Sequence, residues 1–154
     1  MKFRLVHTEV PSLRLDKIEL NEENQKKGTD LGADAALKLG LNVFSDSNRQ
    51  EMFGVLFDIE LVQPEEFKLQ MKFVAWFESP EPLTKEDVNS AFARINAPAI
   101  AFPYLRSFVS LLTLNSGLRP AILSTVNFIE MHKEFEAKQG KVIEKNNPAK
   151  AKQP

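Results

Sequence analysis

The sequence predicts an α+β fold, in which a four-stranded antiparallel sheet packs with two to three helices. In the first half of the chain, apolar residues recur at every second position, and short polar stretches separate these runs. That period is typical of half-buried strands joined as hairpins. In the second half, apolar residues recur every three or four positions, which is typical of amphipathic helices. Strands followed by helices indicate the α+β class.

Four extended segments make up the predicted sheet. The first is interrupted at Pro11, and a polar loop at 21–28 follows it. Turn-forming residues at 45–48 and 63–66 separate the last three segments. Because these connections are short, we expect antiparallel pairing. The extended segments are expected at residues 3–20, 37–43, 52–61 and 68–77.

Capping residues and prolines bound the first two predicted helices. Thr84 is expected to cap the first helix, with Asp87 as its capping-box partner, and Asn96-Ala97-Pro98 is expected to end it. Pro103 is well placed as the first residue of a second helix, which Gly117 is expected to end. The apolar stripe of this second helix is expected to comprise Tyr104, Leu105, Phe108, Val109, Leu111 and Leu112.

A third helix and a tail complete the predicted organisation. Ser124 or Thr125 is expected to cap this helix, and Gly140 is expected to end it. Residues 141–154 are polar and carry several lysines, so we expect them to be disordered. The sequence therefore predicts one domain over residues 1–140, followed by a tail over 141–154.

The composition excludes several classes of function. The absence of Cys excludes disulfides, thiolate catalysis, Cys–zinc sites and iron–sulfur clusters. A formal net charge of −1 offers no basic field for nucleic acid. The N-terminal residues lack the pattern of a signal peptide. The most apolar window, Ile95–Leu114, contains Arg106, and we interpret it as core or subunit interface. We therefore expect a cytoplasmic protein without stable membrane insertion.

Catalytic motifs are nearly absent from the sequence. It contains no glycine-rich nucleotide loop and no zinc-protease motif, and we predict no enzymatic activity, no metal and no cofactor. Glu130, His132 and Glu136 share the third helix and would suit acid–base or metal chemistry. A solvated helix face is the favoured interpretation of these three residues. The adjacent acids Glu22-Glu23 and Glu65-Glu66 are interpreted as solvated loops.

Apolar residues interrupt the mostly charged second face of the predicted sheet. The chain has twelve Phe but only one Trp and one Tyr, so most of its aromatic side chains carry no hydrogen-bonding group. These residues are either covered by the helices or exposed as a hydrophobic groove. A monomer rarely exposes more than roughly a few hundred Å² of contiguous apolar surface, so we predict self-association, a binding groove, or both. The candidate residues for binding unfolded polypeptide are Phe44, Met52, Leu56, Val74 and Trp76.

The segment from Pro98 to Arg106 resembles the signature of the SecB family of export chaperones. The family pattern is close to Pro-x-Ile-x-Phe-Pro-Tyr-x-Arg. Further on, Gly117 and Pro120 keep the family spacing ahead of its Val-Asn-Phe triplet. Upstream of the signature, only the order of the strands resembles the family. The matching residues are Pro98, Ile100, Phe102, Pro103, Tyr104, Arg106, Val126, Asn127 and Phe128.

The resemblance implies a sheet with helices behind it, assembled as a homotetramer that is a dimer of dimers. It also implies ATP-independent holding of unfolded or precursor proteins in long hydrophobic grooves. Apolar contact suits this task because it contributes about 25 cal/mol per Å² buried whatever the sequence of the client. In this family Pro98 and Pro103 would fix the chain direction into the long helix. Tyr104 and Arg106 would satisfy buried or interfacial polar groups.

The charges of this sequence depart from the family pattern. Export chaperones of the family carry an acidic sheet surface and an acidic tail, which dock the translocase motor. Here Lys38, Lys68 and Lys72 dilute Asp58 and Glu60. The tail carries lysines, and Ser124-Thr125 stands where the family tends to place a Pro. We expect holding of unfolded chains to survive these changes, whereas they disfavour the translocase motor as a partner.

Two hypotheses for the function follow. The first is a holdase that serves either export or one dedicated client, in the way of the SecB-like chaperones that protect antitoxins. The alternative is a structural or partner-specific interaction protein on the same fold, without general chaperone activity. Competition between unrelated unfolded clients discriminates the two. A small-molecule carrier or enzyme has little support, because convergent polar groups are missing.

Overall fold

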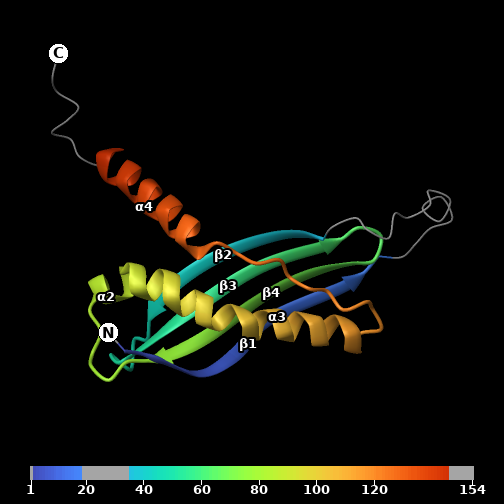
Figure 1. Ribbon diagram of the computed structural model, residues 1–154, viewed down its shortest axis with the longest axis horizontal. Helices are drawn as coiled ribbons and strands as arrows, with labels where there is room; N and C mark the ends of the chain where they lie inside the picture. The colour runs from blue at the N-terminus through green and yellow to red at the C-terminus, as the bar shows by residue number, and fades with distance from the viewer. Residues whose placement is uncertain (1, 19–34, 146–154) are drawn as a thin grey trace, which may run out of the picture.

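The computed structural model describes residues 2–18 and 35–145, with side chains as far as residue 140. Four strands form one antiparallel sheet in the order β1-β4-β3-β2, which confirms the predicted fold class (Figure 1). The polar stretch predicted as a loop at 21–28 lies outside the described residues. The strands are β1 (Arg4–Lys17), β2 (Ala36–Ser45), β3 (Met52–Gln63) and β4 (Phe67–Glu78).

The two predicted turns join β2 to β3 and β3 to β4. In the first, the backbone N–H of Asn48 donates to Asp46 Oδ1 at 2.8 Å, a local bond that favours turns. In the second, the N–H of Glu66 donates to the Gln63 carbonyl at 3.1 Å. Glu66 is also ion-paired with Arg119, so this carboxylate is not simply solvated as predicted. The turns fix the register of three strands and therefore the rows of side chains across the sheet.

The first helix, α2 (Lys85–Asn89), has the predicted capping box. The N–H of Asp87 donates to Thr84 Oγ1 at 3.2 Å, and the N–H of Thr84 donates to Asp87 Oδ2 at 2.7 Å. These bonds satisfy two backbone donors that a helix start would otherwise leave free. The Thr84 hydroxyl also donates to Asp87 Oδ2 at 2.8 Å. The two bonds that Thr84 donates to this carboxylate, from its N–H and its hydroxyl, hold the pKa of Asp87 below its ordinary value, because they favour the ionised form.

The chain does not leave the helical conformation at Asn96-Ala97-Pro98, and that prediction is wrong. The π-helix η1 (Phe92–Asn96) runs directly into α3 (Ala97–Asn115). Pro103 does not begin a helix either, because it lies inside α3. A proline inside a helix costs about 3 kcal/mol or more. Burial against the sheet offsets that cost, since several small and apolar residues of α3 are completely buried. These residues are Ala97, Ala101, Leu105 and Val109.

Gly117 ends α3, as predicted. Its φ of 80° lies in the left-handed region, which strains any residue with a side chain. The N–H of Leu118 donates to the Thr113 carbonyl at 3.0 Å, and the N–H of Gly117 donates to the Leu114 carbonyl at 3.2 Å. This pair of bonds is the Schellman motif, which satisfies carbonyls left free at a helix end.

The last helix, α4 (Phe128–Lys145), has a different cap from the one predicted. Asn127 is the cap, because its Oδ1 accepts from the N–H of Glu130 at 3.2 Å. The prediction of Ser124 or Thr125 is wrong. Asn caps a helix as well as Ser does, and a start at Phe128 brings this aromatic ring into the core, where it is buried.

The predicted end of α4 at Gly140 is also wrong. The helix continues to Lys145, so the first residues of the predicted disordered tail are helical. Glycine inside a helix costs only about 0.5–1 kcal/mol relative to Ala, which neighbouring helix-forming residues can offset. Residues 146–154 of the predicted tail lie outside the described residues.

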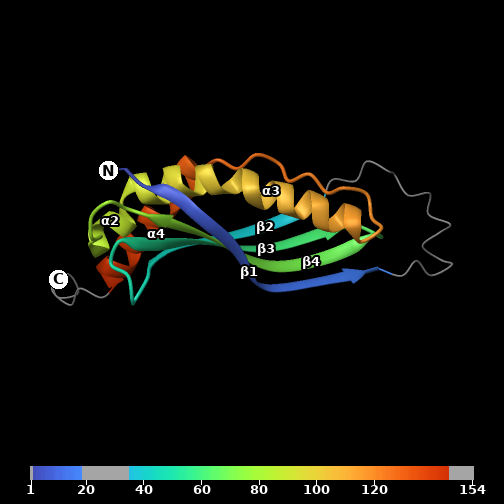
Figure 2. The same cartoon turned by 90° about the horizontal axis from the view of Figure 1, so that it is seen from below.

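The core lies between the sheet and α3. Figure 2 shows α3 across one face of the sheet, with the connection from α3 to α4 on the same side. We call the opposite face the open face, since no described helix covers it. The side chains of β3 and β4 that face α3 are buried almost completely: Phe53, Val55, Phe57, Ile59, Leu61, Leu69, Met71, Phe73, Ala75 and Phe77.

The continuous helical stretch Phe92–Asn115 is long and apolar enough to cross a membrane on length and composition alone. Core helices pass the same test, and 39% of its apolar window is buried inside the fold. The interpretation of this window as core is confirmed for Leu105 and Val109, which have no exposed surface.

Candidate functional site

All five predicted binding residues lie on the open face of the sheet. The register places Phe44 of β2 opposite Gly54 of β3, Gly54 opposite Trp76 of β4, and Trp76 opposite His7 of β1. These four residues form one row across the sheet, near the β2–β3 turn. The neighbouring row comprises Asn42, Leu56, Val74 and Glu9, and Met52 lies beyond Gly54 on the same face of β3.

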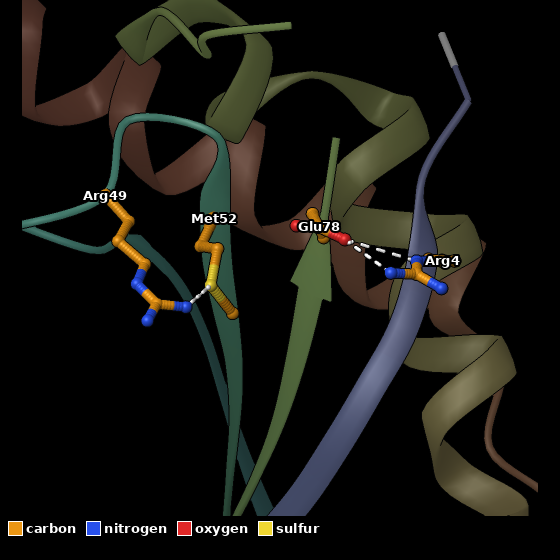
Figure 3. A network of polar contacts seen from close by, with 4 residues as sticks. All are labelled: Arg4, Arg49, Met52 and Glu78. Carbon is orange, nitrogen blue, oxygen red and sulfur yellow. Dashed lines mark hydrogen bonds and ion pairs between the residues drawn. The ribbon is translucent and has the colours of Figure 1, made fainter. Parts of the chain in front are cut away.

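The predicted binding residues differ in how much surface they expose. Phe44, Leu56 and Trp76 are half-buried, whereas Met52 and Val74 are each only 4% exposed. Arg49 covers Met52 in part, because Arg49 Nη1 lies 3.4 Å from Met52 Sδ (Figure 3). In one subunit, therefore, only the first three residues offer apolar surface, and Met52 and Val74 pack beneath and beside them.

Gly54 lets the aromatic residues of two strands meet. A Cβ atom at Gly54 would lie 2.4 Å from Phe44 Cζ, so the tip of the Phe44 ring occupies the space of the missing side chain. The ring reaches across β3 and meets Trp76 edge-on, with ring centroids 5.3 Å apart and an interplanar angle of 81°. This edge-to-face geometry is favourable for aromatic pairs.

Two residues of β1, His7 and Glu9, lie beside Trp76 on the open face, and the sequence pattern missed both. Leu5 packs against the core and pairs with Phe77. A register shift then lies between Leu5 and His7, so that His7 and Glu9 turn to the open face. Such bulges are known to re-aim side chains. Strict alternation would have placed His7 and Glu9 with Leu5 in the core. The only signal of irregularity in this strand was Pro11.

Trp76 is held by both of these β1 residues. Its indole Nε1–H donates to Glu9 Oε1 at 2.9 Å. The His7 ring lies nearly parallel to the Trp76 ring, at an interplanar angle of 26° and a centroid distance of 6.4 Å. With the Phe44 ring reaching across β3 from β2, Trp76 is the centre of the aromatic row, and Glu9 adds a carboxylate from the neighbouring row.

The other end of the open face is charged with both signs. Asp58 lies opposite Lys72, and Glu60 lies opposite Lys38. Lys68 Nζ also lies 3.8 Å from Glu60 Oε1. The predicted dilution of acidic residues by lysines on this face is thus confirmed in space. Alternating charges of this kind give no strong acidic field.

A second apolar surface lies between α3 and the segment that leads to α4. Ser110 Oγ donates to the Ala121 carbonyl at 2.7 Å, and the N–H of Ala121 donates to Thr113 Oγ1 at 2.9 Å. These bonds hold the segment beside α3. An open groove of about 430 Å³ remains between α3 and this segment. It is lined by Ala99, Phe102, Pro103, Arg106, Ser107, Ser110, Thr125, Val126 and Phe128.

An apolar stripe on α3 faces away from the core. Its four residues are each 45–55% exposed and follow one another at intervals of four, seven and three positions, which is a heptad spacing. With 3.6 residues per turn, this spacing defines a second side of the helix. The prediction that Tyr104 and Leu111 widen the core stripe is therefore wrong. The exposed stripe comprises Ile100, Tyr104, Leu111 and Leu114.

Buried polar groups meet where η1 contacts α4. The guanidinium carbon of Arg94 lies 3.7 Å from the Phe135 ring centroid, and Arg94 Nη2 donates to Asn89 Oδ1 at 2.9 Å. Burial lowers the pKa of Arg94. His132 is only 8% exposed, with Nε2 at 3.3 Å from Glu136 Oε1, so the interpretation of a fully solvated helix face is wrong for His132. Within the described residues, no cluster of His, Asp and Glu could hold a metal.

A comparison with models of protein families shows to which family the chain belongs. The family model described as preprotein translocase subunit SecB matches residues 15–139. The chain belongs to the SecB family. The match reaches from the end of β1 into α4, so it includes β2, β3, β4, α2, η1 and α3, and not the signature segment alone.

Relatives that carry the SecB name align with part of the chain. The protein-export protein SecB of Anaplasma phagocytophilum is 33% identical over 70 residues, which cover 44% of each protein. That of Ehrlichia chaffeensis is 37% identical over 62 residues, which cover 40% of this chain and 34% of the relative. An uncharacterised protein of Methanocaldococcus jannaschii is 42% identical over 45 residues, 29% of each chain. The chain thus spans less than half the length of the curated relatives it matches.

A solved structure shares the SecB fold. It is a SecB-like chaperone of Mycobacterium tuberculosis, in complex with a peptide from the HigA1 antitoxin. The match has a TM-score of 0.60 at 18% identity and covers 81% of this chain and 90% of that chain. At this identity the likeness concerns the fold.

The SecB signature residues divide between core and surface. Phe102 and Phe128 are buried, with their rings edge-to-face at 5.7 Å, and Pro98 is also buried. Tyr104 and Arg106 are exposed in the single subunit, so they satisfy no buried group within it. A role for them at an interface stays a prediction. Of the other matching residues, Asn127 caps α4, Val126 is half-buried, and Ile100 and Pro103 are exposed.

Proposed function

We propose that this protein is an ATP-independent holdase, which binds unfolded or precursor polypeptides by apolar contact and catalyses no reaction. Membership of the SecB family supports a chaperone role in general. The observation that carries the proposal is the aromatic row of Phe44, Trp76 and His7 on the open face, flanked by Leu56. Because apolar contact has no direction, such a surface accepts many client sequences.

The groove beside α3 supports the same function. It is apolar, except for Arg106 and a few hydroxyl groups, and it is open to solvent along one side of a rigid helix. A long client could contact this groove and the open face at the same time only by wrapping around the subunit. Affinity would then come from many weak contacts rather than from one pocket.

We further propose that the exposed stripe of α3 joins subunits into a homotetramer. Apolar residues at heptad spacing pack efficiently against a second helix, and the stripe is too exposed to be core. Leu111→Glu should reduce the particle mass in solution, as measured by light scattering. Gln139→Glu, which adds the same charge on an exposed site of α4, should leave the mass unchanged. A wild-type particle no larger than a dimer would contradict the tetramer.

Suppression of aggregation is the direct test of holdase activity. A denatured model protein should stay soluble without ATP when the chaperone is present at equal molar amount, and failure at every ratio would refute the proposal. Trp76→Ala should weaken client binding about tenfold or more, equivalent to about 1.4 kcal/mol, while stability falls less. Titration followed by intrinsic fluorescence is suited to the wild type, since Trp76 is the sole Trp. Equal loss of binding and stability would make Trp76 a core residue.

The partner of the protein would differ between a role in export and the protection of one dedicated client. The mycobacterial neighbour is solved with an antitoxin peptide, which favours a dedicated client in the cytoplasm. The mixed charges of Asp58, Glu60 and Lys72 on the open face disfavour docking of the translocase motor. The alternative is a partner-specific interaction protein on this fold. Only a general holdase should show competition between unrelated unfolded clients.

A further inference from the structure

We propose that the groove between α3 and the segment leading to α4 binds a fatty acid, with its acyl chain on the floor of the groove and its carboxylate on Arg106. The inference goes beyond the proposed function, because the ligand is a small amphiphile and no unfolded polypeptide takes part. The groove offers about 430 Å³ and is open to solvent, so an acyl chain can enter it without any rearrangement of the fold.

The floor of the groove is apolar. Phe102 and Phe128 lie in it with their rings edge-to-face at 5.7 Å, and each is almost wholly buried. Pro103 adds apolar surface from α3, and Val126 adds it from the segment before α4. Each CH2 group that a ligand buries on such a surface strengthens binding. This floor therefore suits a hydrocarbon chain, which needs no hydrogen-bond partner.

A cation and two hydroxyl groups lie at the edge of this apolar floor. Arg106 is exposed, and no ion pair or hydrogen bond engages its guanidinium within the described part of the chain. The hydroxyls of Ser107 and Thr125 are likewise exposed and have no partner among the described residues. The described residues that line the groove include no acid. A carboxylate would thus meet an unneutralised guanidinium, whose planar fork matches a carboxylate through two parallel hydrogen bonds.

The walls of the groove favour an acyl chain over an extended peptide. A peptide on the floor needs partners for its own N–H and C=O groups. The middle of α3 provides no free N–H, since helix N–H groups are bonded within the helix and Pro103 has none. In the segment beside α3, both backbone groups of Ala121 are already bonded to the hydroxyls of Ser110 and Thr113. A peptide would find no backbone pairing at these residues, whereas an acyl chain requires none.

The groove and the exposed stripe occupy different sides of α3. Four residues that line the groove recur at intervals of four, three and four positions, which places them on one side of the helix. Ile100, the first residue of the stripe, lies about 100° around the helix axis from the residue before it. A second subunit can therefore pack on the stripe without filling the groove. The groove side of α3 comprises Ala99, Pro103, Arg106 and Ser110.

Isothermal titration calorimetry of the full chain with laurate, a saturated fatty acid, tests the proposal below the concentration at which laurate forms micelles. We expect saturable binding of one laurate per subunit. Dodecylamine has a chain of equal length and a cationic head, and it should bind at least about tenfold more weakly, because Arg106 repels it. From octanoate through decanoate to laurate, the affinity should rise about two- to fourfold for each added CH2.

Two variants and one control locate the ligand. Arg106→Gln removes the charge and should weaken laurate binding about three- to tenfold, without weakening the binding of dodecylamine. Arg14→Gln makes the same change in net charge on β1, where the side chain is 74% exposed, and should keep the wild-type affinity. Ala99→Leu adds bulk to the groove from an exposed position of α3 and should weaken laurate binding at least about tenfold. Circular dichroism checks that all three are folded.

The emission of Trp76 provides an internal check on the position of the ligand. Trp76 lies on the open face, on the other side of the sheet from α3 (Figure 2), so its emission should stay constant during the titration. An emission change that follows the heat of binding would place laurate on the open face and overturn the proposal.

Several other results would overturn it as well. They are the absence of saturable laurate binding to the wild type, equal affinities for laurate and dodecylamine, equal affinities of Arg106→Gln and Arg14→Gln, and an unchanged affinity in Ala99→Leu. None of them bears on the suppression of aggregation, which is measured without fatty acid. The holdase proposal and the fatty-acid site therefore stand or fail separately.

Discussion

Replacing Gly54 by Ala tests the geometry of the aromatic row. The new Cβ would lie 2.4, 2.8 and 2.9 Å from three atoms of the Phe44 ring, which is closer than any such contact allows. Either the Phe44 ring rotates away or the strands shift. Phe44 lies on the edge strand β2 and is only half-buried, so rotation of the ring is the cheaper response.

The cost of Gly54→Ala can be worked out from these contacts. Overpacking costs about 1–3 kcal/mol, which includes losing the edge-to-face contact with Trp76, worth about 0.5–1.5 kcal/mol. Replacing Gly in a strand returns about 0.5–1 kcal/mol. We therefore expect a loss of about 1–2 kcal/mol in the free energy of unfolding, or a fall of about 2–8 °C in Tm for a chain of this size.

Urea unfolding followed by circular dichroism measures the loss, and the emission of Trp76 should shift because its neighbour has moved. Gly40→Ala is the matched control. It also lies on the open face, but its Cβ would meet Asp58 Cβ at an ordinary 3.5 Å. In a Phe44→Ala background, Gly54→Ala should become neutral or slightly stabilising, which gives a coupling energy of about 1 kcal/mol or more. Equal costs for Gly54→Ala and Gly40→Ala, or an unchanged cost without the Phe44 ring, would refute the reasoning.

Three further substitutions test the helices. Gly117→Ala should lower the free energy of unfolding by about 1–2 kcal/mol, because a side chain is strained at positive φ, and an unchanged urea midpoint would contradict the Schellman motif. Asp87→Asn should destabilise at neutral pH. Hydrogen bonds from Thr84 lower the folded pKa of Asp87, so its stabilisation is present above the unfolded pKa of about 3.9 and is lost as pH falls through the folded value. Thermal melts of wild type and variant should therefore converge in acid, and a constant difference would contradict this. Phe135→Leu removes the ring beneath Arg94 and should cost about 0.5–2 kcal/mol, seen as faster hydrogen exchange in α4; unchanged exchange would show that the contact is weak.

The strands could be predicted from the sequence because their signals are local. Alternation of apolar residues and short turn-forming stretches act within a few positions. The path of the helices at Pro98 and Pro103 could not be predicted in this way. Proline disfavours the interior of a helix, but burial of α3 against a sheet that is distant in sequence overrides this local preference. The cap of α4 was missed for a similar reason. Several residues before Phe128 can cap a helix, and the packing of Phe128 in the core selects Asn127.

The composition of the open face was predicted in part. The alternation of side chains along β2, β3 and β4 predicted that Phe44, Leu56 and Trp76 share one face, and the structure has them there. The low exposure of Met52 and Val74 depends on neighbours from other segments, and no periodicity encodes it. The position of Glu9 depends on a single extra residue in β1, and a shift of one residue exchanges the two faces of a strand.

The two ends of the open face have to be considered together. An aromatic row alone would make a surface prone to self-association, whereas the opposite charges of Asp58, Glu60 and the lysines keep the rest of the face hydrated. Because those charges largely cancel, they cannot direct a client electrostatically over a long range. Any charge selectivity of the face must therefore come from a carboxylate that is not neutralised by a neighbour. Among the described residues of the aromatic end, Glu9 meets that condition, and the bulge in β1 brings its carboxylate beside Trp76.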